Sequence, residues 1–381
     1  MKNTRFIFNN KPLGELSIGC MRFPSREDAI KVVRKSVENG AFYLDTSPAY
    51  CYHSETENTE TWVGEAIKGI RDKVILSAKC STGNGGDDIG EYSPAHGFSI
   101  TTADQVRKEI EQSLRRLDVD KLDCYQLWAV HSPKIFNEAF KKGGWMEGVM
   151  KAKDEGLFDH LGITGHGGSA DIKTWVDAGC FEMMTVPFNI MDNSRLEGIR
   201  YALSKNMAVI AMNPLAGGFL GSPSESIAKA MTEFDIDSAF DMAFRYVTSF
   251  EGVSALAGMS YESQAEDNIR VFAKKGFTEK QAEEVRIKFF SMINAKEHKC
   301  TSCGYCMPCP NGINIPEVLK IRNYATVLEL ESAKNDLKNR YTRDDGFKVE
   351  NCTECLACES KCPNAVNIVE LLKEVRTIGV I

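Results

Sequence analysis

Short apolar runs alternate with longer amphipathic segments along residues 16–273 of the chain. Runs rich in Val, Ile, Leu and aromatic residues predict strands, and segments with apolar residues at every third or fourth position predict helices. The predicted strands cover residues 16–20, 42–45, 74–79, 122–128, 160–164, 183–187, 208–212 and 252–257. The predicted helices cover residues 25–39, 59–68, 102–117, 136–154, 169–178, 193–205, 238–248 and 261–273. Residues 4–14 precede them and predict a β-hairpin that turns at Asn9-Asn10.

The strand–helix order repeats eight times, which is the order of a closed (β/α)8 barrel of typically about 250 residues. An open doubly wound sheet would bind a dinucleotide at a G-x-G-x-x-G turn after its first strand. The early turns of this chain lack that sequence. We therefore predict an α/β protein with a (β/α)8 TIM barrel over residues 1–296, which includes the hairpin and a final amphipathic helix at 278–295.

Eight of the thirteen cysteines lie in two runs near the end of the chain, each ending in Cys-Pro. Two-cluster ferredoxins space their ligands as C-x2-C-x2-C-x3-C-P, and the last cysteine of each run binds the cluster of the other run. The second run has this spacing, whereas the first has one residue fewer before its last cysteine. We predict two [4Fe–4S] clusters, one on Cys300, Cys303, Cys306 and Cys362, the other on Cys352, Cys355, Cys358 and Cys309. Residues 297–381, helical and charged over 315–345, would form a C-terminal α-rich ferredoxin-like domain.

Zinc and disulfides are weaker explanations of the same cysteines. Zinc sites favour separated C-x2-C pairs, often with histidine, and His298 is the one histidine near the runs. Disulfides belong to oxidising compartments, and the N-terminus lacks the apolar core of a secretion signal. The spacing leaves open whether the clusters carry electrons or only stabilise the domain.

Composition limits the partners. Apolar residues make up 43% and charged residues 26% of the chain, and the formal charge is −7, so an anionic partner such as nucleic acid is not expected. No apolar stretch reaches the roughly 18 residues of a membrane helix. We expect a cytoplasmic protein with no nucleic-acid and no membrane partner.

Three residues suited to proton transfer follow predicted strands, at the end of a TIM barrel where active sites lie. Asp45 and Tyr50 come at and after the end of the second strand, and Lys79 ends the third. A phenol has a pKa near 10, and a neighbouring ammonium group lowers it. The sequence therefore predicts that Lys79, held by Asp45, lowers the pKa of Tyr50 and makes it the proton donor to a carbonyl oxygen.

These residues carry a resemblance to a known family. Residues 15–270 resemble the aldo-keto reductases, because residues 45–50 meet the family pattern D-T-A-x-x-Y and Lys79 stands at its strand-three lysine. Together with the cysteine runs, the chain is similar to the bacterial branch that carries a C-terminal ferredoxin-like domain. Residues 162–166, 187–189 and 213–218 also resemble that branch. The resemblance implies nicotinamide-dependent interconversion of a small-molecule carbonyl and an alcohol.

One departure from the family lies on the fourth strand, where Trp128 stands in place of the active-site histidine of D-x-Y-x-L-H. His131 follows three residues later and is a candidate replacement. His53 is a second candidate, since it lies in an insertion that follows Tyr50. The sequence favours neither histidine over a surface position, and the substitution puts ordinary carbonyl reduction in doubt.

The resemblance also implies a cofactor site. The family's pattern assigns the nicotinamide amide to Thr164 and Gly165, and further cofactor contacts to Asn213, Leu215, Ser260, Gln264 and Asn268. The positions that are usually basic in NADP-dependent members are Gly258 and Gln264 here, and a 2′-phosphate calls for Arg or Lys. The cofactor is therefore NAD or NADP, with NAD supported at least as well as NADP.

Two functions fit these features. The first is an oxidoreductase in which Tyr50, Lys79 and Asp45 serve hydride transfer while the clusters exchange electrons with a ferredoxin or another redox partner. A hydride moves two electrons and a cluster carries one, so clusters with a purely structural role are an alternative. The second function is an electron-transfer iron–sulfur protein whose barrel no longer performs standard carbonyl reduction, as the replacement by Trp128 suggests.

Overall fold

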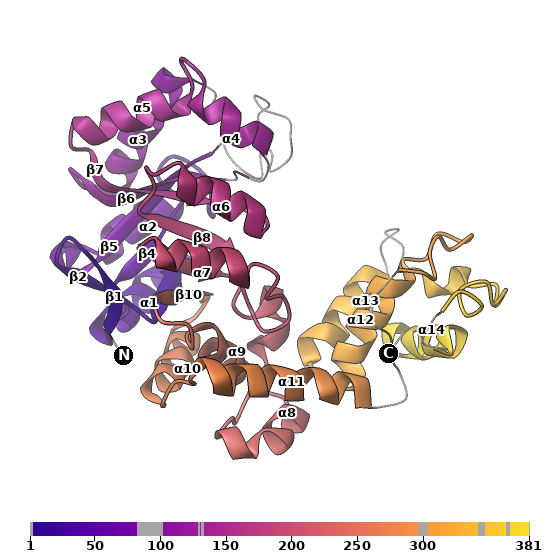
Figure 1. Cartoon of the computed structure of the whole chain (residues 1–381). Coiled ribbons are helices and arrows are strands. Elements are labelled where there is room, and N and C mark those ends of the chain that lie inside the picture. The colour runs from indigo at the N-terminus through magenta and orange to yellow at the C-terminus, as the bar shows by residue number, and fades with distance from the viewer. Residues whose placement is uncertain are drawn as a thin grey trace. The chain divides into compact units, whose positions relative to one another are not determined.

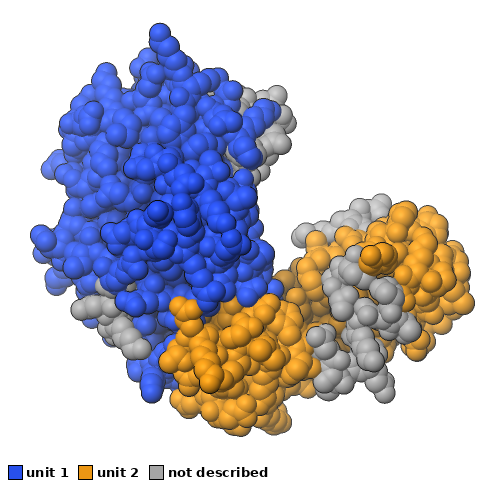
Figure 2. Space-filling view, in the orientation of Figure 1, with its two compact units in different colours: residues 1–214, 247–277 blue, residues 215–246, 278–381 orange. Residues whose placement is uncertain are grey.

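The computed structural model describes residues 3–81, 102–128, 130, 133–295, 300, 304–341, 347–362 and 366–380. The chain forms two compact units, which Figure 2 colours separately. The first comprises Met1–Pro214 and Val247–Phe277, and the second comprises Leu215–Tyr246 and Thr278–Ile381. The domain boundary predicted from the sequence, between residues 296 and 297, falls inside the second unit. The division into a barrel domain and a ferredoxin-like domain at that boundary stays a prediction.

Eight parallel strands of the described chain close into the predicted barrel, in the order β10-β3-β4-β5-β6-β7-β8-β9. Figure 1 labels β4 to β8 and β10 among them. The ring closes because β10 pairs with β3 on one side and with β9 on the other. The strands are β3 (Leu16–Gly19), β4 (Tyr43–Asp45), β5 (Ile75–Ser81), β6 (Leu122–Trp128), β7 (Phe158–Thr164), β8 (Met183–Pro187), β9 (Ala208–Met212) and β10 (Val253–Gly258). The (β/α)8 TIM-barrel prediction is confirmed.

The predicted hairpin is also confirmed, as β1 (Asn3–Phe8) and β2 (Lys11–Gly14). Asn9 and Asn10 both have positive φ, as a tight hairpin turn requires. The Asn9 amide donates to the carboxylates of Asp123 and Asp159 at 2.8 Å each, and Lys11 pairs with Asp123 at 2.6 Å. These aspartates lie near the starts of β6 and β7, so the hairpin covers the amino-terminal end of the barrel and leaves the other end for chemistry.

Side chains cap the first turns of several helices around the barrel. Ser25 accepts a hydrogen bond from the amide of Asp28, and Thr102 forms a capping box with Gln105. A Cβ atom on Gly64 would lie 2.4 Å from the Leu117 carbonyl oxygen, so glycine allows the helices there to pack closely. The helices are α1 (Arg26–Glu38), α2 (Thr59–Ala66), α3 (Ala103–Leu117), α6 (Ser169–Asp177), α7 (Leu196–Ser204) and α10 (Glu262–Ala273), with the 3-10 turn η1 (Arg71–Lys73).

The single helix predicted over residues 136–154 is wrong. The structure has two helices there, α4 (Pro133–Phe140) and α5 (Trp145–Asp154). Gly143 takes a positive φ of 75°, which breaks the helical path. A Cβ atom on Gly144 would lie 2.7 Å from two carbonyl oxygens of α4, so both glycines are needed for the tight connection.

The second unit is helical. Its elements are η2 (Ala216–Gly221), α8 (Glu225–Ala230), η3 (Thr232–Phe234), α9 (Ala239–Val247), α11 (Glu279–Ala295), α12 (Ile315–Thr326), α13 (Glu331–Tyr341), η4 (Val349–Asn351) and α14 (Ile368–Val380). Val247, the last residue of α9, is counted with the first unit. The segment after β9 belongs to this unit because Ser224 donates to the Leu328 carbonyl at 2.6 Å and Ser332 donates to the Phe219 carbonyl at 2.8 Å. No described helix combines the length and the apolar character that crossing a membrane requires.

Candidate functional site

A buried ion pair lies at the carboxyl ends of β4 and β5. The Lys79 ammonium is 2.6 Å from an Asp45 carboxylate oxygen, and the two side chains are 2% and 3% exposed. Lys79 also donates to the Thr46 carbonyl at 2.9 Å. Asp45 pairs with Ser77 in the sheet, and Lys79 is two residues beyond Ser77, so both side chains point to the inside of the barrel. A buried charge requires such a partner, which keeps Lys79 charged in the barrel.

Tyr50 joins this pair from the turn that follows β4. Lys79 lies 3.3 Å from the Tyr50 hydroxyl and 4.8 Å from the centre of its ring. The turn is fixed by the amide of Tyr50, which donates to the Ser47 carbonyl, and by the amide of Thr59, which donates to the Tyr50 carbonyl. Tyr50 is half-buried, whereas Asp45 and Lys79 are buried. The structure thus brings the three predicted residues together, with Tyr50 as the least buried of the three.

The predicted direction of the Tyr50 pKa is wrong. Burial raises the pKa of Tyr50 above its ordinary value, and the nearby Asp45 carboxylate raises it further. The Lys79 ammonium lowers the Tyr50 pKa as expected, but it does not offset the burial. For Lys79, burial lowers the pKa, but Asp45 and Tyr50 outweigh it and the net pKa is raised. At neutral pH the site therefore holds a neutral phenol beside an ammonium group.

Gln126, which was not among the residues predicted from the sequence, organises the inner side of the site. Its amide nitrogen lies within hydrogen-bond distance of three oxygens, at 3.0 Å from Asp45 Oδ1, 3.0 Å from Ser77 Oγ and 3.1 Å from Tyr43 Oη. Its carbonyl accepts from the Thr185 hydroxyl at 2.7 Å. The Asp45 carboxylate is thus held on one oxygen by Lys79 and on the other by Gln126. The available signal was the inward-facing position of Gln126, two residues before Trp128 on β6.

Trp128 ends β6 on the same inward face and contacts Tyr50. The two rings meet edge to face, with centroids 5.7 Å apart and planes at 82°. His131 lies outside the described residues. His53 is exposed, and its ring lies 6.1 Å from that of Trp62 on α2. Within the part of the chain that the structure describes, Trp128 is thus an aromatic side chain that packs against the phenol.

The residues proposed for the nicotinamide amide, Thr164 and Gly165, lie at the end of β7, and two further residues proposed for the cofactor, Asn213 and Leu215, follow β9. Thr164 is buried, and its carbonyl accepts from the Val130 amide at 3.0 Å. A Cβ atom on Gly165 would lie 2.1 Å from the Val130 carbonyl oxygen, so no side chain fits there. Asn213 follows β9 with a φ of 59° and receives a hydrogen bond from Asn189 on its carbonyl. Leu215 begins the second unit.

The residues proposed for the adenosine end lie between β10 and the first turns of α10. The side-chain carbonyl of Gln264 accepts a hydrogen bond from the backbone amide of Ser260 at 2.7 Å. It also accepts one from the backbone amide of Tyr261 and so caps the start of α10. Asn268 lies two turns into the helix region and is 6% exposed. Gln264 is therefore engaged in shaping the loop, while Gly258 is exposed and Ser260 is half-buried.

A pocket in the second unit is lined by cysteines. Cys309, Cys352, Cys355 and Cys358, the four predicted for one cluster, share it with Cys306. Apolar residues from the starts of α12 and α14 complete its wall. Cys303 lies outside the described residues, and Cys300 and Cys362 are half-buried. In the described part of the chain, no group of three His, Cys, Asp or Glu side chains is arranged to hold a single metal ion.

Comparison with known proteins covers both units. Residues 15–288 match the aldo/keto reductase family, and residues 299–367 match the 4Fe-4S dicluster domain. L-galactose dehydrogenase of Arabidopsis thaliana is 28% identical over 289 residues, which are 69% of this chain and 82% of that protein.

Solved structures show the same fold. The holo form of an aldo-keto reductase from Bacillus halodurans matches with a TM-score of 0.60 at 21% identity, over 75% of this chain and 96% of that one. An aldo/keto reductase from Klebsiella pneumoniae, in complex with NADP and acetate, matches with a TM-score of 0.56 at 18% identity, over 75% and 94%.

Proposed function

The chain belongs to the aldo/keto reductase family and carries a 4Fe-4S dicluster domain, and from that premise we propose that it interconverts a small carbonyl compound and an alcohol with a nicotinamide cofactor. The observation that supports this proposal best is the contact of Tyr50 with the buried Lys79–Asp45 pair. The half-buried phenol fits a substrate carbonyl that approaches from the mouth of the barrel, because the charges behind it are shielded from solvent.

Each residue has a distinct role in the proposed reduction. When bound, the nicotinamide supplies a hydride, which brings two electrons and forms the new C–H bond. Tyr50 donates its hydroxyl proton to the carbonyl oxygen, so the product is an alcohol and the tyrosine becomes a phenolate. The Lys79 ammonium, 3.3 Å away, stabilises that phenolate. Asp45 holds the Lys79 ammonium in place, and Gln126 holds the Asp45 carboxylate. In alcohol oxidation the phenolate takes the proton back.

The raised pKa of Tyr50 predicts the pH dependence of both directions. A phenol whose pKa is raised keeps its proton to higher pH, so we expect kcat/KM for reduction to stay flat from about pH 6 to pH 9 and to fall above the ordinary phenol pKa of about 10. Alcohol oxidation needs the phenolate and should rise over the same alkaline range. Initial rates in both directions across this range would check it. A reduction rate that already falls with rising pH near pH 7 would contradict it.

The proposed cofactor is NADH or NADPH. The Klebsiella pneumoniae structure holds NADP, which supports a nicotinamide at this barrel without deciding between the two. We expect at least one reduced nicotinamide to bind, with enhanced or quenched nicotinamide fluorescence on titration of the purified protein. Binding of neither would rule out this function.

A second candidate is favoured by Trp128, which fills the position of the family's histidine beside Tyr50. In that case the barrel no longer performs standard carbonyl reduction, and the protein serves electron transfer through its clusters. The nicotinamide titration separates the two candidates, because only the first requires the cofactor.

We also propose two [4Fe–4S] clusters with the ligand sets that the spacing predicts. The pocket that gathers Cys309 with Cys352, Cys355 and Cys358 supports one set, since Cys309 comes from the other run. Thiolates in an apolar pocket are the donors and surroundings that such clusters use. Their electrons would pass to a ferredoxin or another redox partner.

A further inference from the structure

We propose that Arg22 recognises the 2′-phosphate of NADPH and so allows the protein to use NADPH as well as NADH. This inference rests on the proposed function, because it takes the adenosine end of the cofactor to lie over the loop before α10. The segment around α10 is acidic, and Gly258 and Gln264 stand at the positions that are usually basic in NADP-dependent members of the family. The structure places a cation there from a distant part of the sequence.

Arg22 reaches Gly258 because their strands are neighbours. Gly258 on β10 pairs with Gly19 on β3, and Arg22 lies in the loop that follows β3. A Cβ atom on Gly258 would lie 3.1 Å from Arg22 Cγ and 3.8 Å from Arg22 Cβ. The aliphatic part of Arg22 thus occupies the space that a side chain at position 258 would need. Glycine at 258 therefore leaves room for an arginine from the neighbouring loop.

A second contact fixes the same loop to the start of α10. The Ser260 hydroxyl donates to the Arg22 carbonyl at 2.8 Å. The amide of Ser260 is in turn held by Gln264 at 2.7 Å. Hydrogen bonds therefore connect the Arg22 backbone to Ser260 and to the first turn of α10, and the Arg22 side chain is exposed beside them.

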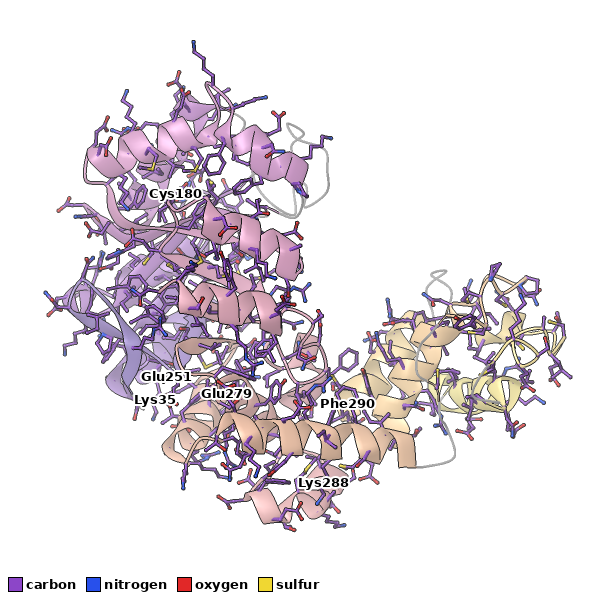
Figure 3. The ribbon with its side chains drawn as sticks, in the orientation of Figure 1. Lys35, Cys180, Glu251, Glu279, Lys288 and Phe290 are labelled. Atoms are coloured by element: carbon purple, nitrogen blue, oxygen red, sulfur yellow. The ribbon has the colours of Figure 1, made fainter. Side chains whose placement is uncertain are left out.

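The charges around this surface leave Arg22 available. Lys35 on α1, labelled in Figure 3, pairs with Glu266 at 2.7 Å and approaches Glu262 at 4.0 Å. The acidic residues of α10 are therefore partly neutralised from the side of α1. Arg22 is exposed, and within the described part of the chain its guanidinium has neither a carboxylate nor a hydrogen-bond partner.

The chemistry of a guanidinium matches a phosphate group. Arginine presents several N–H donors in a planar fork and can bind two phosphate oxygens at once. NADH carries a 2′-hydroxyl in place of that phosphate, so it offers the guanidinium no anionic partner. The contribution of Arg22 should therefore appear in NADPH binding and be almost absent from NADH binding.

The test compares the dissociation constants of NADH and NADPH for the cluster-containing protein and for Arg22→Met, which keeps the aliphatic stem. Loss of charge-assisted hydrogen bonds predicts that Kd for NADPH rises roughly tenfold or more, while Kd for NADH changes less than about twofold. Arg22→Lys should recover part of the NADPH affinity. Arg34→Met, which removes an exposed arginine of α1 that bonds to the Lys68 carbonyl, should leave both constants unchanged.

Competition with adenosine 2′,5′-bisphosphate and with adenosine 5′-phosphate locates the effect on the phosphate itself. Arg22→Met should weaken the first and spare the second. Equal losses for both nicotinamides would show that Arg22 only shapes the loop and would overturn the inference. An unchanged Kd for NADPH would overturn it while the proposed function stands, whereas a wild-type protein that binds neither nicotinamide would overturn both.

Discussion

Tyr50→Phe is expected to lower kcat for reduction of any accepted carbonyl compound by about 100-fold to 10,000-fold, the usual contribution of a positioned acid. The substitution removes the hydroxyl that Lys79 contacts and keeps the ring that packs against Trp128. Lys79 keeps its pair with Asp45 at 2.6 Å, so the charges behind the ring stay compensated. The variant should therefore fold and bind the cofactor as the wild type does, and lose only the proton transfer.

Steady-state rates together with nicotinamide Kd values measure this effect. Tyr52→Phe is a matched control, because the Tyr52 hydroxyl bonds to Glu55 on the exposed side of the same loop. The control should keep the wild-type kcat. If Tyr50→Phe also kept it, another group would supply the proton and the proposed role of Tyr50 would be wrong.

The barrel and the polar trio could be predicted because their signals are local. Each strand is a short apolar run, and a closed parallel barrel places every strand end on one face. Asp45 and Lys79 come together because they end adjacent strands with the same inward orientation. The Asn9-Asn10 pair predicted the hairpin because a two-residue hairpin turn needs positive φ at both of its central residues, and asparagine tolerates that conformation.

Other features depend on contacts between distant residues. Nothing near Gln126 in the sequence indicates that its amide will bind the Asp45 carboxylate and accept from Thr185 on β8. The direction of the Tyr50 pKa depends on how deeply the ring is buried, which only the folded chain determines. Likewise, Arg22 and Gly258 are 236 residues apart and meet only because the barrel closes between β3 and β10.

The extent of the second unit was hidden for the same reason. The segment Leu215–Tyr246 follows β9 and belongs to the second unit. The sequence places it with the barrel, because it lies between a predicted strand and a predicted helix of the barrel. This segment also contacts residues more than 100 positions later in the chain, as Phe219 does with Tyr324 on α12. Hydrophobic periodicity shows that a face is buried, but it does not show which later helix covers it.

The cysteine pocket leads to the second large effect. Cys309→Ala is expected to remove the cluster that also uses Cys352, Cys355 and Cys358, because these four thiols line one pocket. Iron content should fall from about eight atoms per chain toward about four, and the reduced protein should lose one of two [4Fe–4S] signals in electron paramagnetic resonance. Anaerobic purification followed by iron analysis measures it. Cys180→Ala, a half-buried thiol outside the cysteine runs that Figure 3 labels, should keep all the iron.

The same measurement decides how the five cysteines of the pocket are divided. Cys306 lines the pocket too, although the ferredoxin spacing assigns it to the other cluster with Cys300, Cys303 and Cys362. Two clusters that exchange their fourth ligands must lie close together, so a thiol of one cluster can face the pocket of the other. Cys306→Ala and Cys362→Ala should then remove the signal that Cys309→Ala spares. If Cys306→Ala and Cys309→Ala removed the same signal, the crossed ligand assignment would be wrong and each run would bind its own cluster.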